Sequence, residues 1–567
     1  MTTHKKTQQE GLGRRSFLTA GAAMPVIATS ASLSPVNAAP PKVSVPVMTS
    51  ATDLRTTTVT PETDRYSDFI RGNNQRWVAT PEAVILPATT RQVVAAVQRA
   101  VDEDKRLTVR SGGHCYEDFV YSSDTEIVID LSEMHDVGFD RSKDAFYVEP
   151  GATVLNVVST LYRRWGVTVP VGMCYSVGMG GHITGGGWGL LCRLYGLSVD
   201  HLDAVEVVVV GRDGRARAVR ATRDPGDPHH DLWWAHTGGG GGSFGIVTKF
   251  WFRTAGARGE AEKLLPRPPA EVYVHVLAWP WADMTKTKFS RLLHNYGTWH
   301  AQNSRPDGEY DGLMSFLALG HRSNGQLSLL TQLDATQPNS LDRLHRFIST
   351  INDGVEVEPR PMTQSLGEFG PMAEHFTAQR MPWLQATILL GVTNPTLANP
   401  ALRGDSKSAY MRADFPENHI AALYKHLTRE DFTNPNALVV ASSYGGQVNA
   451  VESSATATSH RDSIFKVLYQ SHWATEAEDE ANIAWLRDIY SDVYQATGGV
   501  PIPNTVTSGC LVNYADIDLN DKNFNTSGIA WSELYFGENY ERLQTVKGKW
   551  DPKNLFWHGQ SIRPPRS

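Results

Sequence analysis

The segment VGMCYSVGMGGHITGGGWG, at residues 171–189, contains eight glycines among nineteen residues. Glycine loses more conformational freedom on ordering than any other residue, so a regular helix over this segment is unfavourable. A main chain without side chains instead lets a ligand approach the backbone closely. The segment therefore predicts a binding loop.

Two more segments share this character. RSGGHCYEDF, at residues 110–119, follows a predicted strand, and DLWWAHTGGGGGSFGIVTKFWF, at residues 231–252, predicts a short helix, a glycine loop and a strand. Neither GMGGH at 178–182 nor GGGGGSFG at 238–245 has the strand, GxGxxG and helix order of a doubly wound dinucleotide fold. Backbone amides in such loops can still form a nest of N–H donors for a pyrophosphate.

Composition excludes several classes of protein. The chain has 567 residues and a net charge of −7, so no polyanion-binding surface is indicated and nucleic acid is not an expected partner. Its four cysteines are too few for a disulfide scaffold at this length, and none belongs to a CxxC pair, so no metal site is predicted. The length favours two or more domains.

The N-terminus resembles an export signal. Arg14 and Arg15 precede a short, mildly apolar run that ends near small residues, which is typical of a twin-arginine signal peptide over 1–38. The run is too short and too polar to span a bilayer. We therefore expect a protein secreted in folded form, without a membrane span, and a cofactor loaded before export.

The remaining pattern predicts an α+β fold. Strands are expected over 82–87, 107–111, 126–131 and 145–151, helices over 90–106 and 153–166, and a hairpin over 203–219. Later, amphipathic helices over 337–351 and 476–497 alternate with strands such as 437–449. The predicted divisions are an N-terminal arm over 39–75, a first domain over 76–255, a second over 256–505, and a C-terminal segment over 506–567 that packs back on the first domain.

His114 and Cys174 each follow or lie in a glycine-containing loop. Taken singly, the histidine is more often a hydrogen-bonded structural residue, and the cysteine a buried thiol. A Cys–His nucleophilic dyad is the competing enzymatic interpretation. The residues alone leave these alternatives open.

The order of five motifs resembles the berberine-bridge-enzyme group of flavoprotein oxidases, in the vanillyl-alcohol-oxidase superfamily. The motifs are VRSGGHCYED, VGMCYSVGMGGHITGGGWG, DLWWAHTGGGGGSFGIVTKF, NYADIDL and YFGENYERLQTVKGKWDPKNLFWHGQSI, and the match covers about 65–255 and about 440–562. The resemblance implies a PCMH-type FAD-binding domain of two α/β subdomains, and a substrate domain whose antiparallel sheet is covered by helices. It is strongest to bacterial members that oxidise sugar moieties of antibiotics.

The resemblance also implies roles for individual residues. His114 would carry the 8α-methyl of FAD and Cys174 would attack C6 of the isoalloxazine, so that the flavin is bound by two covalent bonds. Tyr514 would be the base, Asn513 would line the flavin, and Tyr444 would lie on a strand facing the substrate. Cys115 is expected to pack, not to react. The other expected cofactor-binding residues are Arg110, Ser111, Gly112, Gly113, Gly178, Gly180, Gly181, His182, Gly185, Gly187, Gly238, Gly241, Gly242, Gly245 and Val247.

The implied function is oxidation of an alcohol, or an amine-like centre, in a bulky secondary metabolite or glycoside, with O2 as the acceptor and H2O2 as the product. Alternatives are an oligosaccharide oxidase of the same family and a flavoprotein that sequesters an antibiotic. The expected partners are a small-molecule substrate and O2, and the expected assembly is a monomer or a homodimer.

Overall fold

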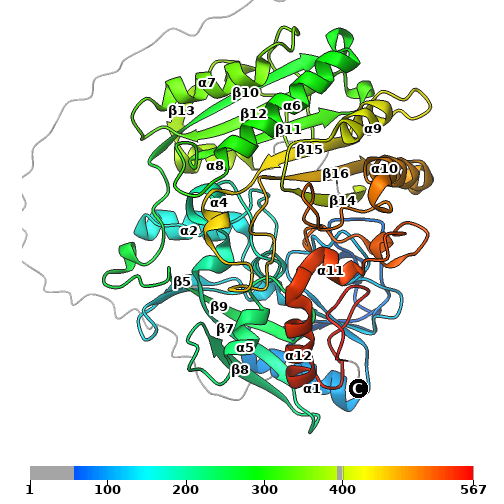
Figure 1. The fold of residues 1–567 in the computed structure, drawn as a ribbon. Helices are drawn as coiled ribbons and strands as arrows, with labels where there is room; N and C mark the ends of the chain where they lie inside the picture. The colour runs from blue at the N-terminus through cyan, green and yellow to red at the C-terminus, as the bar shows by residue number, and fades with distance from the viewer. Residues whose placement is uncertain (1–55, 392–398, 400, 566–567) are drawn as a thin grey trace, which may run out of the picture. The chain divides into compact units, whose positions relative to one another are not determined.

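The computed structural model describes residues 56–391, 399 and 401–565, and Figure 1 shows their arrangement. The export signal predicted over 1–38 and residues 39–55 of the predicted N-terminal arm lie outside these residues. The described part combines three sheets with α-helices, so the predicted α+β class is confirmed. None of its helices is long and apolar enough to cross a membrane.

A small four-stranded sheet has the order β1-β2-β4-β3, in which β1 pairs antiparallel and the other strands run parallel. Its strands are β1 Thr57–Val59, β2 Ala83–Leu86, β4 Ile127–Asp130 and β3 Leu107–Arg110. The parallel strands are connected through helix α1, Thr90–Asp102. Thr89 caps this helix by accepting a hydrogen bond from the amide of Gln92 at 3.3 Å.

A five-stranded antiparallel sheet has the order β5-β6-β9-β7-β8. Its strands are β5 Val137–Asp140, β6 Ala145–Val148, β9 Ile246–Phe252, β7 Leu202–Val210 and β8 Ala216–Thr222, the last two forming the predicted hairpin. The buried face of α1 carries Val93, Ala96, Val97 and Ala100, at helical spacing. These side chains join a core cluster with Ile127 from the first sheet and Val208 from the second. Helix α1 therefore holds the two sheets together.

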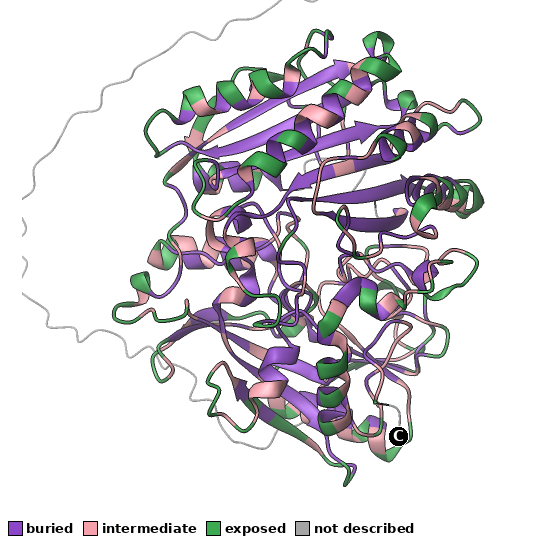
Figure 2. Ribbon diagram, in the orientation of Figure 1, coloured by how far each residue is buried: buried purple, intermediate pink, exposed green. Residues whose placement is uncertain are grey.

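The largest sheet is antiparallel and has seven strands in the order β13-β10-β12-β11-β15-β16-β14. The strands are β13 Gln379–Pro382, β10 Glu271–Pro280, β12 Gln326–Asp334, β11 Leu313–Gly320, β15 Leu438–Ser443, β16 Phe465–Trp473 and β14 Arg403–Met411. The boundary predicted at 255/256 falls between the strands of this sheet and those of the other two. Every residue of β11, β12 and β16 is buried (Figure 2), so both faces of the sheet are covered.

Helices cover one face of the large sheet in Figure 1. They are α6 Lys286–Asn303, α7 Ser340–Asn352, α9 Glu417–Leu427 and α10 Asp479–Val493. The remaining helices are α2 Val154–Trp165, α3 Met179–Thr184, α4 Cys192–Tyr195, α5 His230–Ala235, α8 Trp383–Leu390, α11 Trp531–Phe536 and α12 Tyr540–Trp550. Helix α2 ends at Gly166, as predicted, with the glycine in a left-handed conformation at φ 67°.

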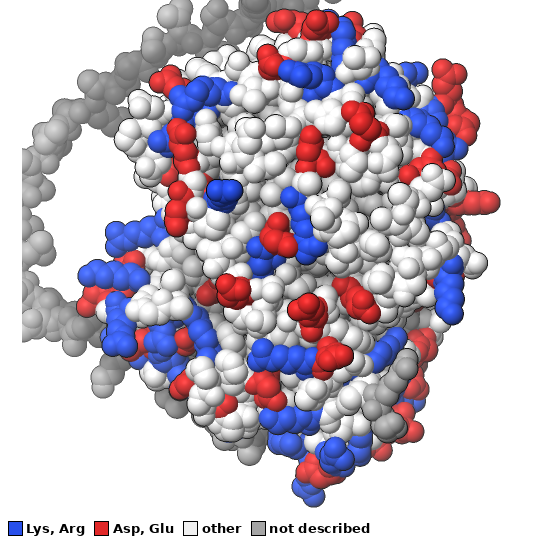
Figure 3. All heavy atoms as spheres, viewed as in Figure 1, with Lys and Arg blue, Asp and Glu red and all other residues white. Residues whose placement is uncertain are grey.

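The C-terminal segment packs against the glycine loop that precedes β9. Lys547 of α12, fully buried, donates to the carbonyl oxygen of Ser243 at 2.6 Å and to the carboxylate of Asp551 at 2.6 Å. The same helix contacts α5. On the face shown in Figure 3, acidic and basic side chains are interspersed.

Candidate active site

A cavity of about 360 Å³ brings together segments that are far apart in the sequence. It is lined by the end of β3 with the loop that follows, by the glycine loops of 172–188 and 239–247, and by the C-terminal stretches 511–515 and 556–560. Single residues, Glu368 and Lys466, complete the lining on the side of the large sheet. All the motifs singled out from the sequence meet at this one cavity.

Two of the loops interlock at one wall of the cavity. A Cβ atom on Gly112 would lie 2.2 Å from the amide nitrogen of Gly178, and one on Gly178 would lie 2.2 Å from Oγ of Ser111. Ser111 fastens the contact by donating to the carbonyl oxygen of Pro150 at 2.6 Å and accepting from the amide of Gly180 at 3.2 Å. Glycine is therefore required at both positions by close backbone approach.

His114 and Cys174 both contact the hydroxyl of Ser176. Nε2 of His114 is 2.9 Å from Oγ of Ser176, and Sγ of Cys174 is 3.9 Å from the same oxygen. Both residues line the cavity. Two nucleophilic side chains thus converge on one hydroxyl at the cavity wall. Cys115 lines the same cavity, but among the described residues it makes no hydrogen bond to Ser176.

Neither His114 nor Cys174 is charged at neutral pH. Burial, and then the charge of Arg110, lower the pKa of His114 to about 4, so its imidazole is neutral and has a free lone pair at neutral pH. Burial, and then the charge of Glu368, raise the pKa of Cys174 to about 11. This thiol is therefore protonated until a base removes the proton.

The C-terminal segment contributes to the cavity lining a histidine, His558, that the sequence interpretation missed. The ring of His558 stacks on Phe119 with 4.3 Å between centroids, and its Nε2 donates to the carbonyl oxygen of Gly241 at 3.0 Å. It therefore connects the first loop, the glycine loop before β9 and the C-terminus. The only sequence signal was the position of His558 in the last of the five motifs.

Tyr514 is paired with a lysine. Nζ of Lys466 donates to the hydroxyl oxygen of Tyr514 at 3.1 Å and lies 4.6 Å from the centroid of the same ring. The ammonium also stacks over Trp188 at 3.5 Å. The Tyr116 ring meets Tyr514 edge-on at 5.8 Å. Tyr514 is thus held between an aromatic edge and a cation.

The alternation of strand β16 explains why Lys466 reaches the cavity. Successive side chains of a strand point to opposite faces, so Lys466 and Gln470 share one face and Tyr469 lies on the other. Gln470 donates to the hydroxyl of Tyr116 at 3.2 Å on the cavity side, while Tyr469 packs on Tyr490 of α10. The sequence signal for this residue was a lysine within the largely apolar segment IFKVLY, at residues 464–469.

Burial shifts both members of the pair toward their neutral forms. It raises the pKa of Tyr514 well above its ordinary value, with further contributions from Tyr116 and Glu368. It lowers the pKa of Lys466 to about 7, against the attraction of Glu368. Near neutral pH the pair therefore holds a phenol beside an amine that is poised to accept a proton.

The structure brings most of the predicted residues to the cavity. Those that line it are Arg110, Ser111, Gly112, Gly113, His114, Cys174, Gly178, Gly180, Gly181, His182, Gly185, Gly241, Gly242, Gly245, Val247, Asn513 and Tyr514. Asn513 donates through Nδ2 to the carbonyl oxygen of His182 at 3.2 Å. His182 itself accepts at Nε2 from the amide of Gly172 at 3.0 Å, so its ring is used in holding the loop.

Three predicted residues are not among the residues that line the cavity. A Cβ on Gly187 would collide with Ser198, and one on Gly238 with Thr458, so both glycines serve packing. Tyr444 lies one residue past the end of β15, not within the strand, and is fully buried.

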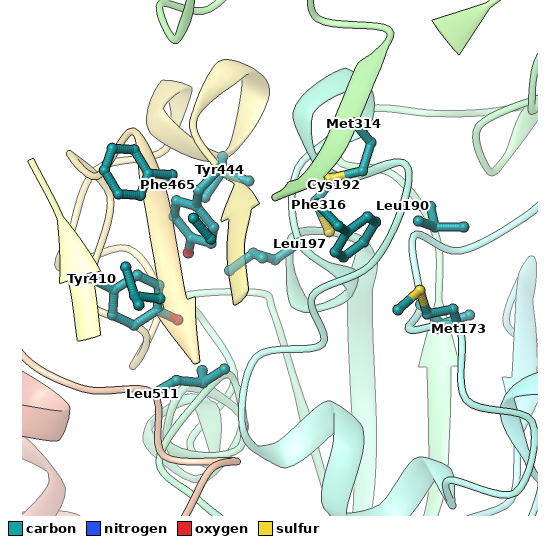
Figure 4. Close-up of a cluster of buried hydrophobic side chains, with 14 of the residues drawn as sticks. Met173, Leu190, Cys192, Leu197, Met314, Phe316, Tyr410, Tyr444, Phe465 and Leu511 are labelled. Carbon is teal, nitrogen blue, oxygen red and sulfur yellow. The ribbon is translucent and has the colours of Figure 1, made fainter. Parts of the chain in front are cut away.

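Figure 4 shows Tyr444 with Tyr410 and Phe465 in the hydrophobic cluster that also contains Met173 and Leu511. The ring of Tyr444 packs edge-on against Tyr410 with 5.1 Å between centroids. Met173 and Leu511 also line the cavity. Tyr444 therefore belongs to the packed wall behind the cavity.

The residues present fit FAD. The glycine loops expose main chain along the cavity, which is how a nest of amides binds a pyrophosphate. Two cavity-lining donors, Nε of Arg110 and Nε1 of Trp188, are buried without a hydrogen-bond partner among the described residues. Buried donors are normally satisfied, so both are suited to acceptor atoms of a bound cofactor.

Comparison with known proteins agrees with this fit. The families described as "FAD binding domain" and "Berberine and berberine like" match residues 81–219 and 510–563. The chain is 43% identical to aclacinomycin-N/aclacinomycin-A oxidase of Streptomyces galilaeus, over 88% of each chain. It is 34% identical to hexose oxidase of Chondrus crispus, over 88% of this chain and 93% of the relative.

A solved structure has the same fold. A glycopeptide hexose oxidase complexed with teicoplanin superposes with a TM-score of 0.83 at 42% identity, covering 90% of this chain and 99% of the other. Together, the shared motifs, the cavity that unites them and these similarities make the chain an FAD-binding oxidoreductase that belongs to the berberine-bridge-enzyme-like family of FAD-linked oxidases.

Proposed function

We propose that the protein is a secreted oxidase that carries FAD on two covalent bonds and oxidises an alcohol carbon of a sugar-bearing natural product, with O2 as acceptor and H2O2 as product. The observation that carries the proposal is the Tyr514–Lys466 pair, at 3.1 Å, in the same cavity as His114 and Cys174. A base and two possible attachment points for a cofactor are thus in one cavity.

The double attachment is supported by the convergence of His114 and Cys174 on Ser176. The hydrogen bond at Nε2 of His114 leaves its Nδ1 as the nitrogen available for a covalent bond. The neutral imidazole and the thiol both retain a nucleophilic lone pair. Two bonds would hold the flavin in a cavity that must also admit a bulky substrate.

The chain's own contribution to the reaction is proton transfer. Bound FAD would supply the hydride acceptor for the substrate carbon, and O2 would be the final electron acceptor. Tyr514 accepts the proton of the substrate hydroxyl while its own proton moves to the amine of Lys466. A phenol with a raised pKa is a poor base alone, and the neighbouring amine makes the transfer feasible near neutral pH.

The substrate class is inferred from the relatives. Both curated relatives and the solved structure carry names that refer to a hexose or to the antibiotic aclacinomycin. Trp188, Tyr116 and Tyr514 provide aromatic surface in the cavity, which suits a sugar face or a flat aglycone. We infer that a sugar hydroxyl of a glycosylated metabolite is the group oxidised.

Two measurements test the proposal. Denatured protein should retain the visible absorption of flavin, and native protein should release H2O2 when supplied with sugars, oligosaccharides and aromatic glycosides. Turnover of free oligosaccharides alone would favour the oligosaccharide oxidase. Tight binding of a glycoside with no peroxide from any compound would favour sequestration and would overturn the proposed reaction.

Export by the twin-arginine route is a separate part of the proposal, supported by the residues around Arg14 and Arg15. The double substitution Arg14→Lys with Arg15→Lys keeps the charge and should retain the protein in the cell. Fractionation with an antibody provides the measurement. Equal secretion of both forms would contradict the twin-arginine assignment.

A further inference from the structure

Five groups surround the amine of Lys466. Tyr514 accepts its hydrogen bond at 3.1 Å and Trp188 lies 3.5 Å beneath it. Cys192 of α4 and His182 of α3 interact with it electrostatically, and so does Glu368 from the loop that follows α7. Lys466 has no carboxylate within ion-pair distance among the described residues. The protonation of Lys466 therefore depends on which of these groups is charged.

Three of the four titratable neighbours are neutral near pH 7. Burial raises the pKa of Tyr514 well above its ordinary value and that of Cys192 to about 12, so both keep their protons. Burial, and then Lys466 itself, lower the pKa of His182 to about 4, so this imidazole is uncharged. Glu368 is the remaining group: burial raises the pKa of its carboxyl, and the positive charge of Lys466 opposes that shift.

A short turn presents Glu368 to the cavity. The amide of Leu366 donates to the carbonyl oxygen of Phe369 at 2.9 Å, and the reverse bond is 3.2 Å long. Gly367 between them has φ 60°, a conformation that favours glycine. Leu366 and Phe369 are buried, and Phe369 packs on Phe316 with 5.6 Å between centroids. The turn is thus anchored on both sides of the glutamate.

The carboxylate of Glu368 has no hydrogen bond or ion pair within the part of the chain that the structure describes, although it lines the cavity together with Lys466 and Tyr514. Structural carboxylates in protein interiors are normally paired. Elsewhere in this chain, buried Asp516 and Asp551 each contact a lysine at 2.7 and 2.6 Å. The unpaired state of Glu368 points to a role in the cavity.

We propose that Glu368 is a positioning residue for the reaction, whose carboxylate holds the positive charge that forms on Lys466 as Tyr514 takes the substrate proton. The inference rests on the proposed function of Tyr514. In this step the O–H bond of the substrate breaks, and Tyr514 gains that proton and gives its own to Lys466. The O–H electron pair forms the new C=O bond, and the hydrogen of the C–H bond leaves with its electron pair as hydride, for which bound FAD would be the acceptor. The cation then forms on Lys466, which lines the same cavity as Glu368 and is attracted by its carboxylate. That attraction is stronger in a poorly solvated site than in water.

The pH dependence of the resting holoenzyme tests this inference without any substrate. The visible absorption of the flavin should titrate with Lys466, and Lys466→Met should remove that step. Glu368→Gln removes the charge at constant size and should move the midpoint to lower pH, because the ammonium loses its partner. Glu374→Gln is the matched control, since the Glu374 side chain is 67% exposed and six residues away.

Anaerobic flavin reduction by a substrate provides the second readout. With Glu368→Gln, the acid limb of the rate profile should move to lower pH, and the plateau rate should fall roughly tenfold, equivalent to about one pKa unit of lost base strength. Glu368→Leu is measured alongside, so that the result does not depend on one variant folding. The midpoint of the spectral titration is compared between each folded Glu368 variant, wild type and Glu374→Gln. If Glu368→Gln or Glu368→Leu has the same midpoint as wild type and Glu374→Gln, the inference is wrong.

Failure of the proposed function gives a different pattern. If Tyr514→Phe were reduced at the wild-type rate, Tyr514 would not be the base, and the spectral titration would still report whether Glu368 acts on Lys466. If Glu368→Gln weakens only substrate affinity and leaves the titration midpoint unchanged, Glu368 binds substrate and the positioning role is wrong.

Discussion

Lys466 donates a 3.1 Å hydrogen bond to the hydroxyl of Tyr514, although the two residues are 48 positions apart in the sequence. Lys466 comes from β16, next to the edge strand β14 of the large sheet, and Tyr514 comes from the C-terminal segment. The pair exists only because that segment returns to the cavity. Its chemistry leads to the first two predictions.

Replacing Tyr514 with phenylalanine should slow flavin reduction by roughly a hundredfold to ten-thousandfold, because the proton acceptor is lost. The flavin content should stay unchanged, since no attachment residue is altered. Anaerobic stopped-flow absorption measures the rate. Tyr444→Phe is the matched control: its ring is fully buried and does not line the cavity, so a loss of rate as large as that of Tyr514→Phe would show that both predicted tyrosines are catalytic.

The reduction rate should rise with pH through about 7, the pKa to which burial lowers Lys466. Below that pH the amine is protonated and cannot take the proton of Tyr514; above it the amine is free. Lys466→Met should abolish this limb and slow reduction at every pH. The rate is measured from about pH 6 to about pH 8, roughly one unit either side of that pKa. A rate that does not change over this range would contradict the role of the amine.

Single replacement of His114 or Cys174 by alanine should leave flavin attached by one bond, and the double replacement should release all flavin on denaturation. Acid precipitation followed by absorption and intact mass measures this. Cys115→Ala is the control, because Cys115 lies next to His114 and lines the same cavity but has no contact with Ser176. If Cys115→Ala lost one covalent bond to the flavin and Cys174→Ala kept both, Cys115 would be the attachment residue and Cys174 would not.

The buried ion cluster beside the tyrosine motif should be sensitive to loss of its lysine. Lys407 contacts Asp516 and Asp518, each at 2.7 Å, with a side chain 3% exposed. Burial disfavours the charged form of Lys407, but the combined attraction of the carboxylates is larger, so the pKa of Lys407 is raised. Lys407→Met leaves the buried carboxylate of Asp516 without an ion-pair partner, while Asp518 keeps Arg487 at 2.7 Å. The change should cost about 3–5 kcal/mol of unfolding free energy at neutral pH.

The sign of the pH effect follows from the same carboxylates. Burial already raises the pKa of Asp516 to about 6, and removing Lys407 raises it further. An acid whose pKa is raised in the folded state is destabilising above that pKa, and the penalty is relieved as pH falls through it. Denaturant titrations of Lys407→Met should therefore approach wild-type stability below pH 6, whereas Lys549→Met, at a side chain 51% exposed, should change stability little at any pH.

Local patterns predicted much of the framework. The apolar spacing of 90–106 corresponds to α1, the Asp213-Gly214 turn of the predicted hairpin lies between β7 and β8, and Gly166 ends α2. These features depend on neighbouring residues, so they can be derived from short stretches. The strand predicted over 437–449 ends at Ser443, because the chain turns at Gly445 and Gly446, both with positive φ.

The sequence by itself determined the α+β class, the family, and the residues whose types are demanded by chemistry or by backbone conformation: the glycines of the loops, His114, Cys174 and Tyr514. The tertiary structure decided which glycines line the cavity, placed Tyr444 in the packed wall, and set Lys466 and Glu368 beside Tyr514. Side-chain proximity across a sheet depends on strand order and register, which are set by the packing of the whole core and not by any single segment.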